Sequence, residues 1–319
     1  MKQVLHHSIF EPLSNGHGGE KRSYQLLFEA QKNGYVFCNL ELRNKDKVTL
    51  RRLWCAMWLL LKVYRHSPWL SLKVFFRRVR DVAYYYDQLI AFFQKTQEQV
   101  FLWESVRPEL YFLPYLAKKY GKRVIAFPHN TESLVPNQKP YLFRMSKFQA
   151  FQWEIKVLGT CDEVYAISHE ETWLLNLWGV KTRCYLYSPV GVAKEQVLLL
   201  KEQRGKTQDK SFFLLLGTAI NQPTRMGMQH LIDLWKKENM QVPLHIGGYG
   251  TDLLHIPKEQ SNIVFLGELS DSKLMEEQIH TRALLVYQPP TTGALTRISE
   301  ATMAGIPVIV NYAAARSYY

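Results

Sequence analysis

The hydrophobic positions along the chain fall into short apolar runs that alternate with segments of helical periodicity. Runs at 4–10, 35–40 and 100–103 predict buried strands, and the segments between them carry apolar residues three and four apart, as amphipathic helices do. The same alternation returns at tighter spacing over 212–310. Because strands joined by helical crossovers form parallel sheets with helices on both faces, we expect an α/β chain built of doubly wound sheets.

Two stretches interrupt this alternation. Residues 49–95 are basic and aromatic and lack strand signals, which predicts two or three helices with a break near 67–68. Residues 191–210 are hydrophilic and are expected to form a linker. A length of 319 residues suits two domains. We therefore expect Rossmann-like domains over 1–190 and 211–319, with ligands at the carboxyl ends of the strands in the cleft between them.

Composition narrows the class of protein. With 47% hydrophobic and 21% charged residues, the chain has the composition of a globular protein, which excludes a disordered or fibrous one. Its 40 Lys and Arg against 28 Asp and Glu give a net charge of +12, so phosphorylated ligands, nucleic acid and anionic membranes are the partners to consider. The four cysteines lie far apart without a CxxC pair, which argues against a zinc site and against a disulfide framework.

The location of the protein follows from its apolar stretches. The N-terminal sequence MKQVLHHSIFEP has no apolar core of signal-peptide length. The longest apolar run, WCAMWLLL at 54–61, is roughly a third of the length that crosses a bilayer. We therefore expect a cytoplasmic protein.

The most specific pattern is PPTTGALTRISEATMAGIPVIV, residues 289–310. A tight turn at 291–293 after a buried strand would direct the backbone N–H groups of 293–296 toward an anion. Glu300 lies about one turn farther along and is placed to accept hydrogen bonds from vicinal hydroxyls such as those of a ribose. The other interpretation of this spacing is an ordinary αβ unit with an exposed Glu.

This stretch resembles the C-terminal donor-binding signature of group 1 glycosyltransferases, the retaining enzymes of glycosyltransferase family 4 with the GT-B fold. The resemblance covers nearly the whole chain outside 45–95 and implies two Rossmann-like domains that face each other across a cleft. The chain ends a few residues after the strand near Val310, so we expect an incomplete donor domain. The other segments that resemble the family, in its order, are the glycine loop and first helix at 14–27, a His segment at 127–133, CDEVYAISHEE at 161–171, and donor-domain units at 213–227, 245–250 and 262–274.

The resemblance also implies which residues bind the nucleotide-sugar donor. Glu300 corresponds to the family carboxylate that recognises the donor ribose, and Leu269 lies where the family backbone meets the nucleobase. The remaining residues expected at the donor are Gly217, Arg225, Gly293, Ala294, Leu295 and Thr296.

The sequence departs from the family pattern at three positions near these residues. Thr292 replaces a carboxylate that touches the donor sugar, and Thr218 and Met226 stand near the places of an Arg and a Lys that clamp the diphosphate. Arg225 is then the only nearby cation that the resemblance points to. These departures keep open an alternative function, a GT-B-shaped protein that binds a glycan or a nucleotide without transferring a sugar.

His129 is the expected catalytic residue, because it resembles the family histidine that contacts the transferred sugar or the acceptor. A turn histidine is the other interpretation of its position after a strand. Gly16, Gly18 and Gly19 are expected to form a phosphate loop, since glycines let the backbone approach a ligand closely.

The resemblance implies a retaining transfer from a nucleotide-diphosphate sugar to a glycan or lipid-linked acceptor, with the leaving phosphate helping to deprotonate the acceptor. It requires neither a metal nor a cofactor other than the donor itself. The sequence agrees with this chemistry, because it has no DxD pair in a plausible loop, no GxSxG elbow and no Walker lysine.

Residues 51–80 interleave basic and aromatic side chains. Cationic amphipathic helices rich in Trp and Phe lie in the bilayer interface, so this segment predicts a peripheral association with an anionic membrane on its inner face. The other interpretation is a pair of core helices with a solvated basic face. No nucleic-acid module is recognised, and we expect no nucleic-acid partner. The residues expected on the interfacial face are Trp54, Trp58, Trp69 and Phe75, ringed by Arg51, Arg52, Arg77, Arg78 and Arg80.

Overall fold

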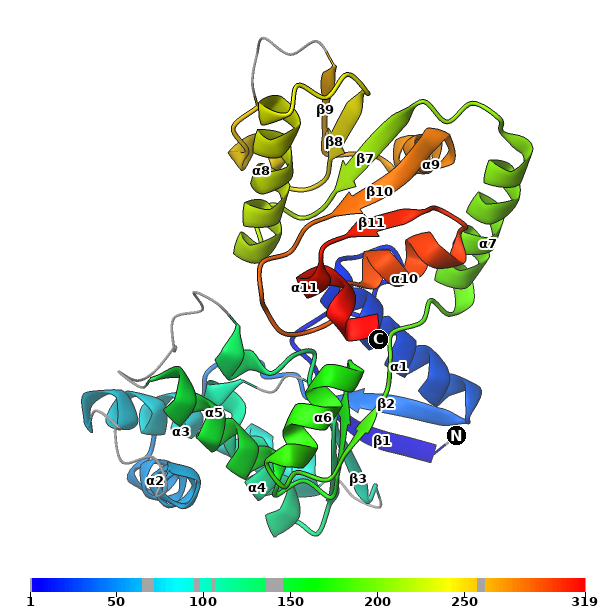
Figure 1. Cartoon of the computed structure of the whole chain (residues 1–319). Helices are drawn as coiled ribbons and strands as arrows, with labels where there is room; N and C mark the ends of the chain where they lie inside the picture. The colour runs from blue at the N-terminus through cyan, green and yellow to red at the C-terminus, as the bar shows by residue number, and fades with distance from the viewer. Residues whose placement is uncertain are drawn as a thin grey trace. The chain divides into compact units, whose positions relative to one another are not determined.

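A computed structural model describes residues 2–64, 72–94, 98–104, 107–135, 146–256 and 262–318 of the chain. These residues form two compact units (Figure 1). Unit 1 comprises Met1–Pro12 and Arg22–Leu186, and unit 2 comprises Leu13–Lys21 and Tyr187–Tyr319. The boundary thus differs from the expected one, because the segment before the first helix groups with the second half of the chain.

Unit 1 is built on a parallel six-stranded sheet with the strand order β2-β1-β3-β4-β5-β6. Its strands are β1 (Lys2–His7), β2 (Tyr35–Asn39), β3 (Val100–Trp103), β4 (Arg123–Ala126), β5 (Glu163–Ala166) and β6 (Thr182–Cys184). Its helices are α1 (Gly18–Lys32), which begins in unit 2, then α2 (Leu50–Tyr64), α3 (Leu72–Gln94), η1 (Pro108–Leu110), α4 (Phe112–Lys119), η2 (Glu132–Leu134), α5 (Lys147–Leu158) and α6 (His169–Leu177).

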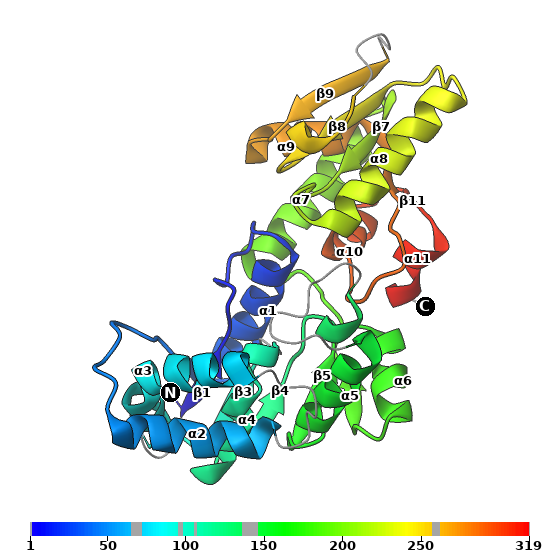
Figure 2. The same ribbon diagram turned by 90° about the vertical axis from the view of Figure 1, so that its left-hand side faces the viewer.

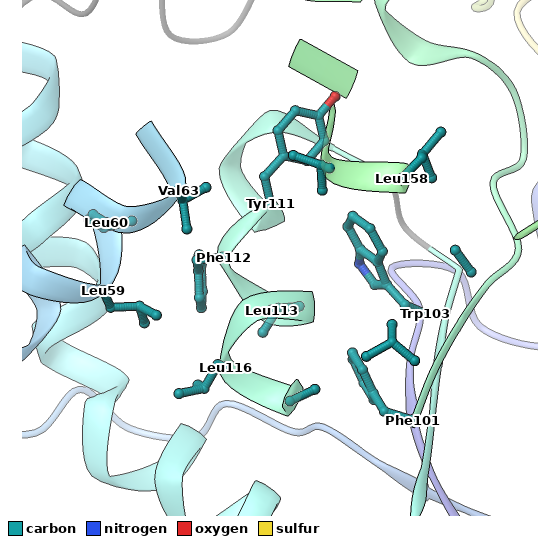
Figure 3. Close-up of a cluster of buried hydrophobic side chains, with 14 of the residues drawn as sticks. Leu59, Leu60, Val63, Phe101, Trp103, Tyr111, Phe112, Leu113, Leu116 and Leu158 are labelled. Atoms are coloured by element: carbon teal, nitrogen blue, oxygen red, sulfur yellow. The ribbon is translucent and has the colours of Figure 1, made fainter. Parts of the chain in front are cut away.

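The core of unit 1 lies between β3 and the helices that cover it. Phe101 and Trp103 alternate with less buried residues along β3 and are fully buried, as the period of a strand requires. Leu113 and Leu116 lie three residues apart on α4 and enter the same cluster (Figure 3). Burying a side chain of this size contributes roughly 1.5–3 kcal/mol, so this cluster holds the sheet and helices together.

Unit 2 is built on a parallel five-stranded sheet with the strand order β11-β10-β7-β8-β9. Its strands are β7 (Phe212–Leu216), β8 (Leu244–Gly247), β9 (Ile263–Gly267), β10 (Thr281–Val286) and β11 (Val308–Val310). Its helices are α7 (Gly191–Lys206), α8 (Gln222–Lys237), η3 (Thr251–Leu253), α9 (Asp271–His280), α10 (Thr296–Met303), α11 (Tyr312–Ala315) and η4 (Arg316–Tyr318). Two doubly wound parallel sheets confirm the α/β architecture predicted from the alternating pattern.

The expected linker is a helix. Residues 191–206 form α7, and the apolar side chains of Val197 and Leu200 are buried in the core of unit 2. Arg204 is buried too, and its Nη1 donates hydrogen bonds to three backbone carbonyls at 2.7, 3.0 and 2.7 Å. The hydrophilic composition was misleading because only one narrow side of this helix is buried, while Leu198 and Leu199 are exposed. The break expected near 67–68 lies outside the described residues.

Capping side chains explain where several helices begin. Ser168 precedes α6, and its Oγ accepts a hydrogen bond from the backbone N–H of Glu171, as expected for a helix start. Helix α9 begins in the same way, since the Oγ of Ser270 accepts a hydrogen bond from the backbone N–H of Lys273. A Ser hydroxyl in an extended backbone conformation reaches this N–H, whereas Asp271 is already helical.

Candidate functional site

The strand order marks one place in each sheet where ligands bind in open α/β folds. In unit 1 the chain passes from β1 to β2 on one side and returns to β3 on the other, so the order reverses between β1 and β3. In unit 2 the order reverses between β7 and β10. The crevice outside the carboxyl ends of the strands at such a switch point is the usual ligand site. We therefore built the candidate site from the residues at these ends.

A buried carboxylate lies at the switch point of unit 1. Glu104 directly follows β3, and its Oε1 is 2.5 Å from Nε2 of His6 at the end of β1. Its Oε2 is 3.1 Å from Nε2 of His129, which follows β4, and it accepts a further hydrogen bond from the hydroxyl of Ser23 on α1. The structure thus brings the predicted His129 together with Glu104, His6 and Ser23, which the sequence analysis did not select.

The charge of Glu104 fixes how His129 is oriented. Burial opposes ionisation of Glu104, but hydrogen bonds from His129 and His6 outweigh it and hold the pKa of the carboxyl well below its usual range. An ionised carboxylate can only accept, so Nε2 of His129 carries the hydrogen of their bond. Nδ1 of His129 is buried and has no hydrogen-bond partner among the described residues. Nδ1 is therefore the ring nitrogen of His129 that the described residues leave without a partner.

Two more buried carboxylates hold the loop that follows β4. Oε1 of Glu171 accepts hydrogen bonds from the N–H and the hydroxyl of Thr131 at 2.6 and 3.1 Å. Glu154 accepts from the backbone N–H groups of Glu132 and Ser133 at 3.0 and 2.9 Å, and burial raises its pKa to about 8. Both carboxylates come from helices that pack on the sheet, so the loop is anchored from the interior of unit 1.

In unit 2, Glu300 lies on α10 and both of its oxygens have partners. Nζ of Lys21 donates to Oε2 at 2.7 Å, and the hydroxyl of Tyr187 donates to Oε1 at 2.7 Å. A carboxylate has about four acceptor positions, so ribose hydroxyls can still bind here. Nearby, a Cβ on Gly18 would lie 3.4 Å from Oγ1 of Thr296, which places the start of α1 against the start of α10.

The glycine loop before α1 does not have the features of a phosphate cradle. The backbone N–H of His17 donates to Oε2 of Glu20 at 2.8 Å, and the N–H of Gly19 donates to Nδ1 of His17 at 3.2 Å. A Cβ on Gly16 would lie 2.2 Å from Oε2 of Glu20, so a carboxylate lies directly against the loop. A negative charge in this position repels a phosphate. The local geometry therefore does not favour the phosphate role expected for Gly16, Gly18 and Gly19.

The loop between β10 and α10 is clamped by the residues of η4. The hydroxyl of Ser317 donates to the carbonyl of Gly293 at 2.8 Å, and the hydroxyl of Tyr318 donates to the carbonyl of Leu295 at 2.6 Å. Ala294 lies between these two fixed carbonyls. Leu295 is the N-cap of α10, and its side chain provides no hydrogen bond to the first N–H groups of this helix. The loop predicted to face an anion is held by these two hydrogen bonds from η4.

Glycines let other loops approach the end of β7 closely. A Cβ on Gly217 would lie 2.8 Å from Cγ2 of Thr224, so no larger residue fits there without a shift. The side chain of Leu269 covers Gly247, whose Cβ would lie 2.7 Å from Cδ1 of Leu269. Arg225 is half-buried in the first turn of α8. The structure thus places Gly217 and Arg225 near the switch point of unit 2, whereas the side chain of Leu269 packs on the end of the next strand.

A second arginine, which the sequence analysis passed over, also lies at this switch point. Nη1 of Arg297 is 3.6 Å from the position of a Cβ on Gly217. Burial lowers the pKa of Arg297 to about 10. A signal was present in the sequence, because Arg297 is a charged residue inside an otherwise small and apolar segment one turn before Glu300. Glu104 had a comparable signal, since it is the first polar residue after the apolar run 100–103.

Helix α2 of unit 1 carries an exposed apolar stripe. Leu50, Trp54, Trp58 and Leu61 recur at intervals of three and four and are exposed, with 59% exposure for Trp54 and 51% for Trp58. The opposite side of α2, with Leu60 at its centre, is buried in the core. Figure 2 shows α2 beside α3 in unit 1. The apolar stripe is therefore not the face that packs α2 into its own unit.

Part of the predicted interfacial face is corrected by the structure. Phe75 is buried in the core, and its neighbour Phe76 is exposed instead. Arg52 forms ion pairs with Asp87 at 2.6 Å and with Asp46 at 3.6 Å, so its charge is already paired. Arg78 likewise pairs with an aspartate of its own helix. Trp69 lies outside the described residues, and Arg51, Arg77 and Arg80 are exposed.

Over the parts of the chain that the structure describes, no group of three or more His, Cys, Asp or Glu side chains could hold a metal ion. No helix within the same ranges is long and apolar enough to cross a membrane.

The two sheets and their switch points define a protein of the two-domain, Rossmann-like GT-B fold, and comparisons with solved structures agree. The chain is similar to a glycosyltransferase from Rickettsia africae ESF-5, with 12% identity and a TM-score of 0.50 over 97% of this chain and 79% of that one. It is also similar to the catalytic domain of starch synthase IV from Arabidopsis thaliana bound to ADP and acarbose, with 11% identity and a TM-score of 0.52 over 97% of this chain and 82% of that one. At these identities the likeness shows the fold.

A further similar structure is that of TarM, with 10% identity and a TM-score of 0.45. It covers 66% of this chain, and the chain spans 40% of the length of that protein. No protein-family model matches the chain, and neither does the sequence of a curated protein.

Proposed function

We propose that the chain is a retaining glycosyltransferase that moves a sugar from a nucleotide-diphosphate sugar to a glycan or lipid-linked acceptor. The observation that carries the proposal is the gathering of Gly217, the fixed loop 293–295 and Glu300 in unit 2, around the switch point of a GT-B fold. The retaining course rests on the resemblance of 289–310 to the donor signature of retaining enzymes. The starch synthase structure, which contains ADP, has the same fold.

Unit 2 would bind the donor. The carboxylate of Glu300 would accept hydrogen bonds from ribose hydroxyls, while Lys21 and Tyr187 hold it in a fixed orientation. The N–H groups at the start of α10 would face the negative charge that develops on the departing diphosphate. Departure of this group leaves its oxygen with the electron pair of the broken bond, and that oxygen takes the proton of the acceptor hydroxyl.

Unit 1 would bind the transferred sugar and the acceptor. His129 would touch a sugar hydroxyl through Nδ1, the ring nitrogen without a partner among the described residues, while Nε2 donates to Glu104. Glu104 would act as a positioning residue, since it fixes the ring orientation of His129 without reaching the substrate itself. The role follows the pattern in which a buried carboxylate orients a histidine.

The exposed stripe on α2 supports a lipid-linked acceptor. Cationic helices that expose Trp and Leu lie in the interface of anionic bilayers, and α2 exposes both next to Arg51 and Lys62. Arg77 and Arg80 add exposed positive charge on α3. We propose that unit 1 binds the surface of an anionic membrane through this stripe and so meets an acceptor carried on a lipid.

The test is the release of sugar from a panel of UDP-, ADP- and GDP-sugars without added acceptor. A transferase should release nucleoside diphosphate slowly from one of these donors, and the same donor should raise the melting temperature of the protein. A donor that raises the melting temperature without any release would favour the second candidate, a binder without transfer. Thr292 gives that candidate its support, because it lacks the carboxylate expected against the donor sugar. If no donor of the panel binds, the transferase and the nucleotide-binding form of the second candidate both fail.

A further inference from the structure

Arg297 differs from the buried arginines Arg22 and Arg204 in having no partner among the described residues. It forms no hydrogen bond and no ion pair with any of them. Arg204 shows the usual alternative, because its guanidinium donates to three backbone carbonyls. Arg297 is half-buried, and only its Nε is buried without a hydrogen-bond partner. A half-buried cation without a counter-charge can pair with an anion from outside the chain.

The position of Arg297 indicates where such an anion would bind. The guanidinium lies beside Gly217, which directly follows β7, and Arg297 itself belongs to the first turn of α10, after β10. These two strands flank the switch point of unit 2. A Cβ on Gly217 would lie 2.8 Å from Cγ2 of Thr224 and 3.6 Å from Nη1 of Arg297, so this glycine lets both side chains approach the end of β7 closely. A ligand at this end of β7 would therefore meet the guanidinium beside the backbone.

The chemistry of the surroundings selects an anion with several oxygens. A guanidinium pairs best with two oxygens of a phosphate or carboxylate, and the start of α10 adds N–H donors and a positive helix end. Glu300, the carboxylate one turn away, is engaged by Lys21 and Tyr187 rather than by Arg297. The cation therefore remains available for an incoming anion.

We propose that Arg297 is the cation that binds the diphosphate of the donor, in place of the positive charge that Thr218 and Met226 do not supply. The identity of the ligand as a donor diphosphate rests on the proposed function. The binding of an anion at Arg297 is independent of that function. Burial that lowers the pKa of Arg297 still leaves it charged at neutral pH, so the pairing is available under ordinary conditions.

The experiment compares the wild-type protein with Arg297→Met, Arg297→Lys and a matched control, Arg282→Met. Arg282 is an exposed cation at the amino end of β10, the opposite end from Gly217. Binding of UDP, ADP, GDP, the three parent nucleosides and inorganic pyrophosphate is measured by calorimetry, and the melting temperature of each ligand-free protein is recorded.

Arg297→Met should weaken binding of the preferred nucleoside diphosphate and of pyrophosphate by about 10- to 100-fold, as expected for losing charge-assisted hydrogen bonds, and leave nucleoside binding unchanged. Arg297→Lys should fall between, because an ammonium keeps the charge but not the fork. The ligand-free Arg297→Met protein should melt near wild type, since Arg297 has no hydrogen bond or ion pair with the described residues to lose. Arg282→Met should match wild type throughout.

The inference is overturned if Arg297→Met binds diphosphate and pyrophosphate within twofold of wild type. It is also overturned if the ligand-free variant has a clearly lowered melting temperature, which would indicate a structural arginine. If wild type binds pyrophosphate in an Arg297-dependent way but no nucleoside diphosphate, the proposed function fails and the anion site stands. If wild type binds neither, both fail. Should Arg297→Met not fold, the same comparison is made with Arg297→Lys, for which wild-type affinity for every phosphate probe would be the contrary result.

Discussion

Replacing Glu154 by glutamine tests the buried carboxylates that anchor the loop after β4. Burial raises the pKa of Glu154 from 4.5 to about 8, although the N–H groups of Glu132 and Ser133 favour the charged form. The folded protein therefore holds a proton that the unfolded chain has lost between these two pH values. The stabilising contribution of the protonated group is complete below pH 4.5, declines as the pH rises, and is fully lost above about pH 8.

The size of the effect follows from the shift. Each unit of pKa is worth about 1.4 kcal/mol, so the free energy of unfolding should fall by at most roughly 5 kcal/mol across this window through Glu154 alone. The amide that replaces this carboxyl would be neutral throughout, and its carbonyl can still accept one of the two N–H bonds. We expect Glu154→Gln to match wild type near pH 5 and to be more stable by several kcal/mol near pH 8.

Urea unfolding followed by tryptophan fluorescence measures this difference, because Trp153 is buried next to Glu154 in sequence and reports on unit 1. The difference between variant and wild type is taken at each pH, which removes the contribution of all other titrating groups. Glu41→Gln, at an exposed position of unit 1, should show no such trend. A difference that stays constant from pH 5 to pH 8, or a variant that loses stability relative to wild type as the pH rises, would refute the reasoning.

Three further predictions concern the ligands. Glu300→Ala should weaken binding of a nucleoside diphosphate by about 1.5–3 kcal/mol in calorimetry. Tyr187→Phe, which removes one donor to the carboxylate, should cost clearly less. Equal losses would mean that Glu300 acts by holding α10 in place rather than by binding the ligand. His129→Ala should slow sugar release and leave nucleotide affinity intact, and a parallel loss of both would make it structural. In vesicle flotation the protein should bind anionic vesicles, and raised salt should weaken this binding. The double variant Trp54→Ser, Trp58→Ser should release the protein, and so should charge reversal of the exposed arginines of 51–80. Absence of binding at low salt would contradict the membrane proposal.

The fold could be predicted because the evidence for it is local. Alternating apolar runs and helical segments fix the order of strands and helices, and the parallel sheets then follow from the crossovers. Segment 191–210 was the exception, since Val197 and Leu200 occupy too narrow a stripe to stand out among the charged residues. Its helix is stabilised by carbonyls distant in sequence, which receive hydrogen bonds from Arg204 and which no local pattern reveals.

The candidate site could be predicted only in part, because its geometry is made by residues far apart in sequence. His129 was found through its family resemblance, but its partner Glu104 lies 25 positions away. His6, which also bonds to Glu104, lies 98 positions from that carboxylate, and no motif joins the three residues. The same holds for Lys21, which lies 279 positions from its partner Glu300. A charged residue that directly follows a buried strand is the one local signal that would have selected Glu104.

The two switch points differ in how their charges are balanced, and this difference bears on what each can bind. In unit 1 the carboxylate of Glu104 already accepts bonds from three side chains, and Nδ1 of His129 is among the polar atoms without a partner in the described residues. In unit 2 both oxygens of Glu300 have partners, but the guanidinium of Arg297 has no counter-charge among the described residues. A ring nitrogen suits a hydroxyl, whereas an unpaired cation suits an anion. The electrostatics of each unit, considered separately, thus support the binding of an uncharged sugar in unit 1 and of a diphosphate in unit 2.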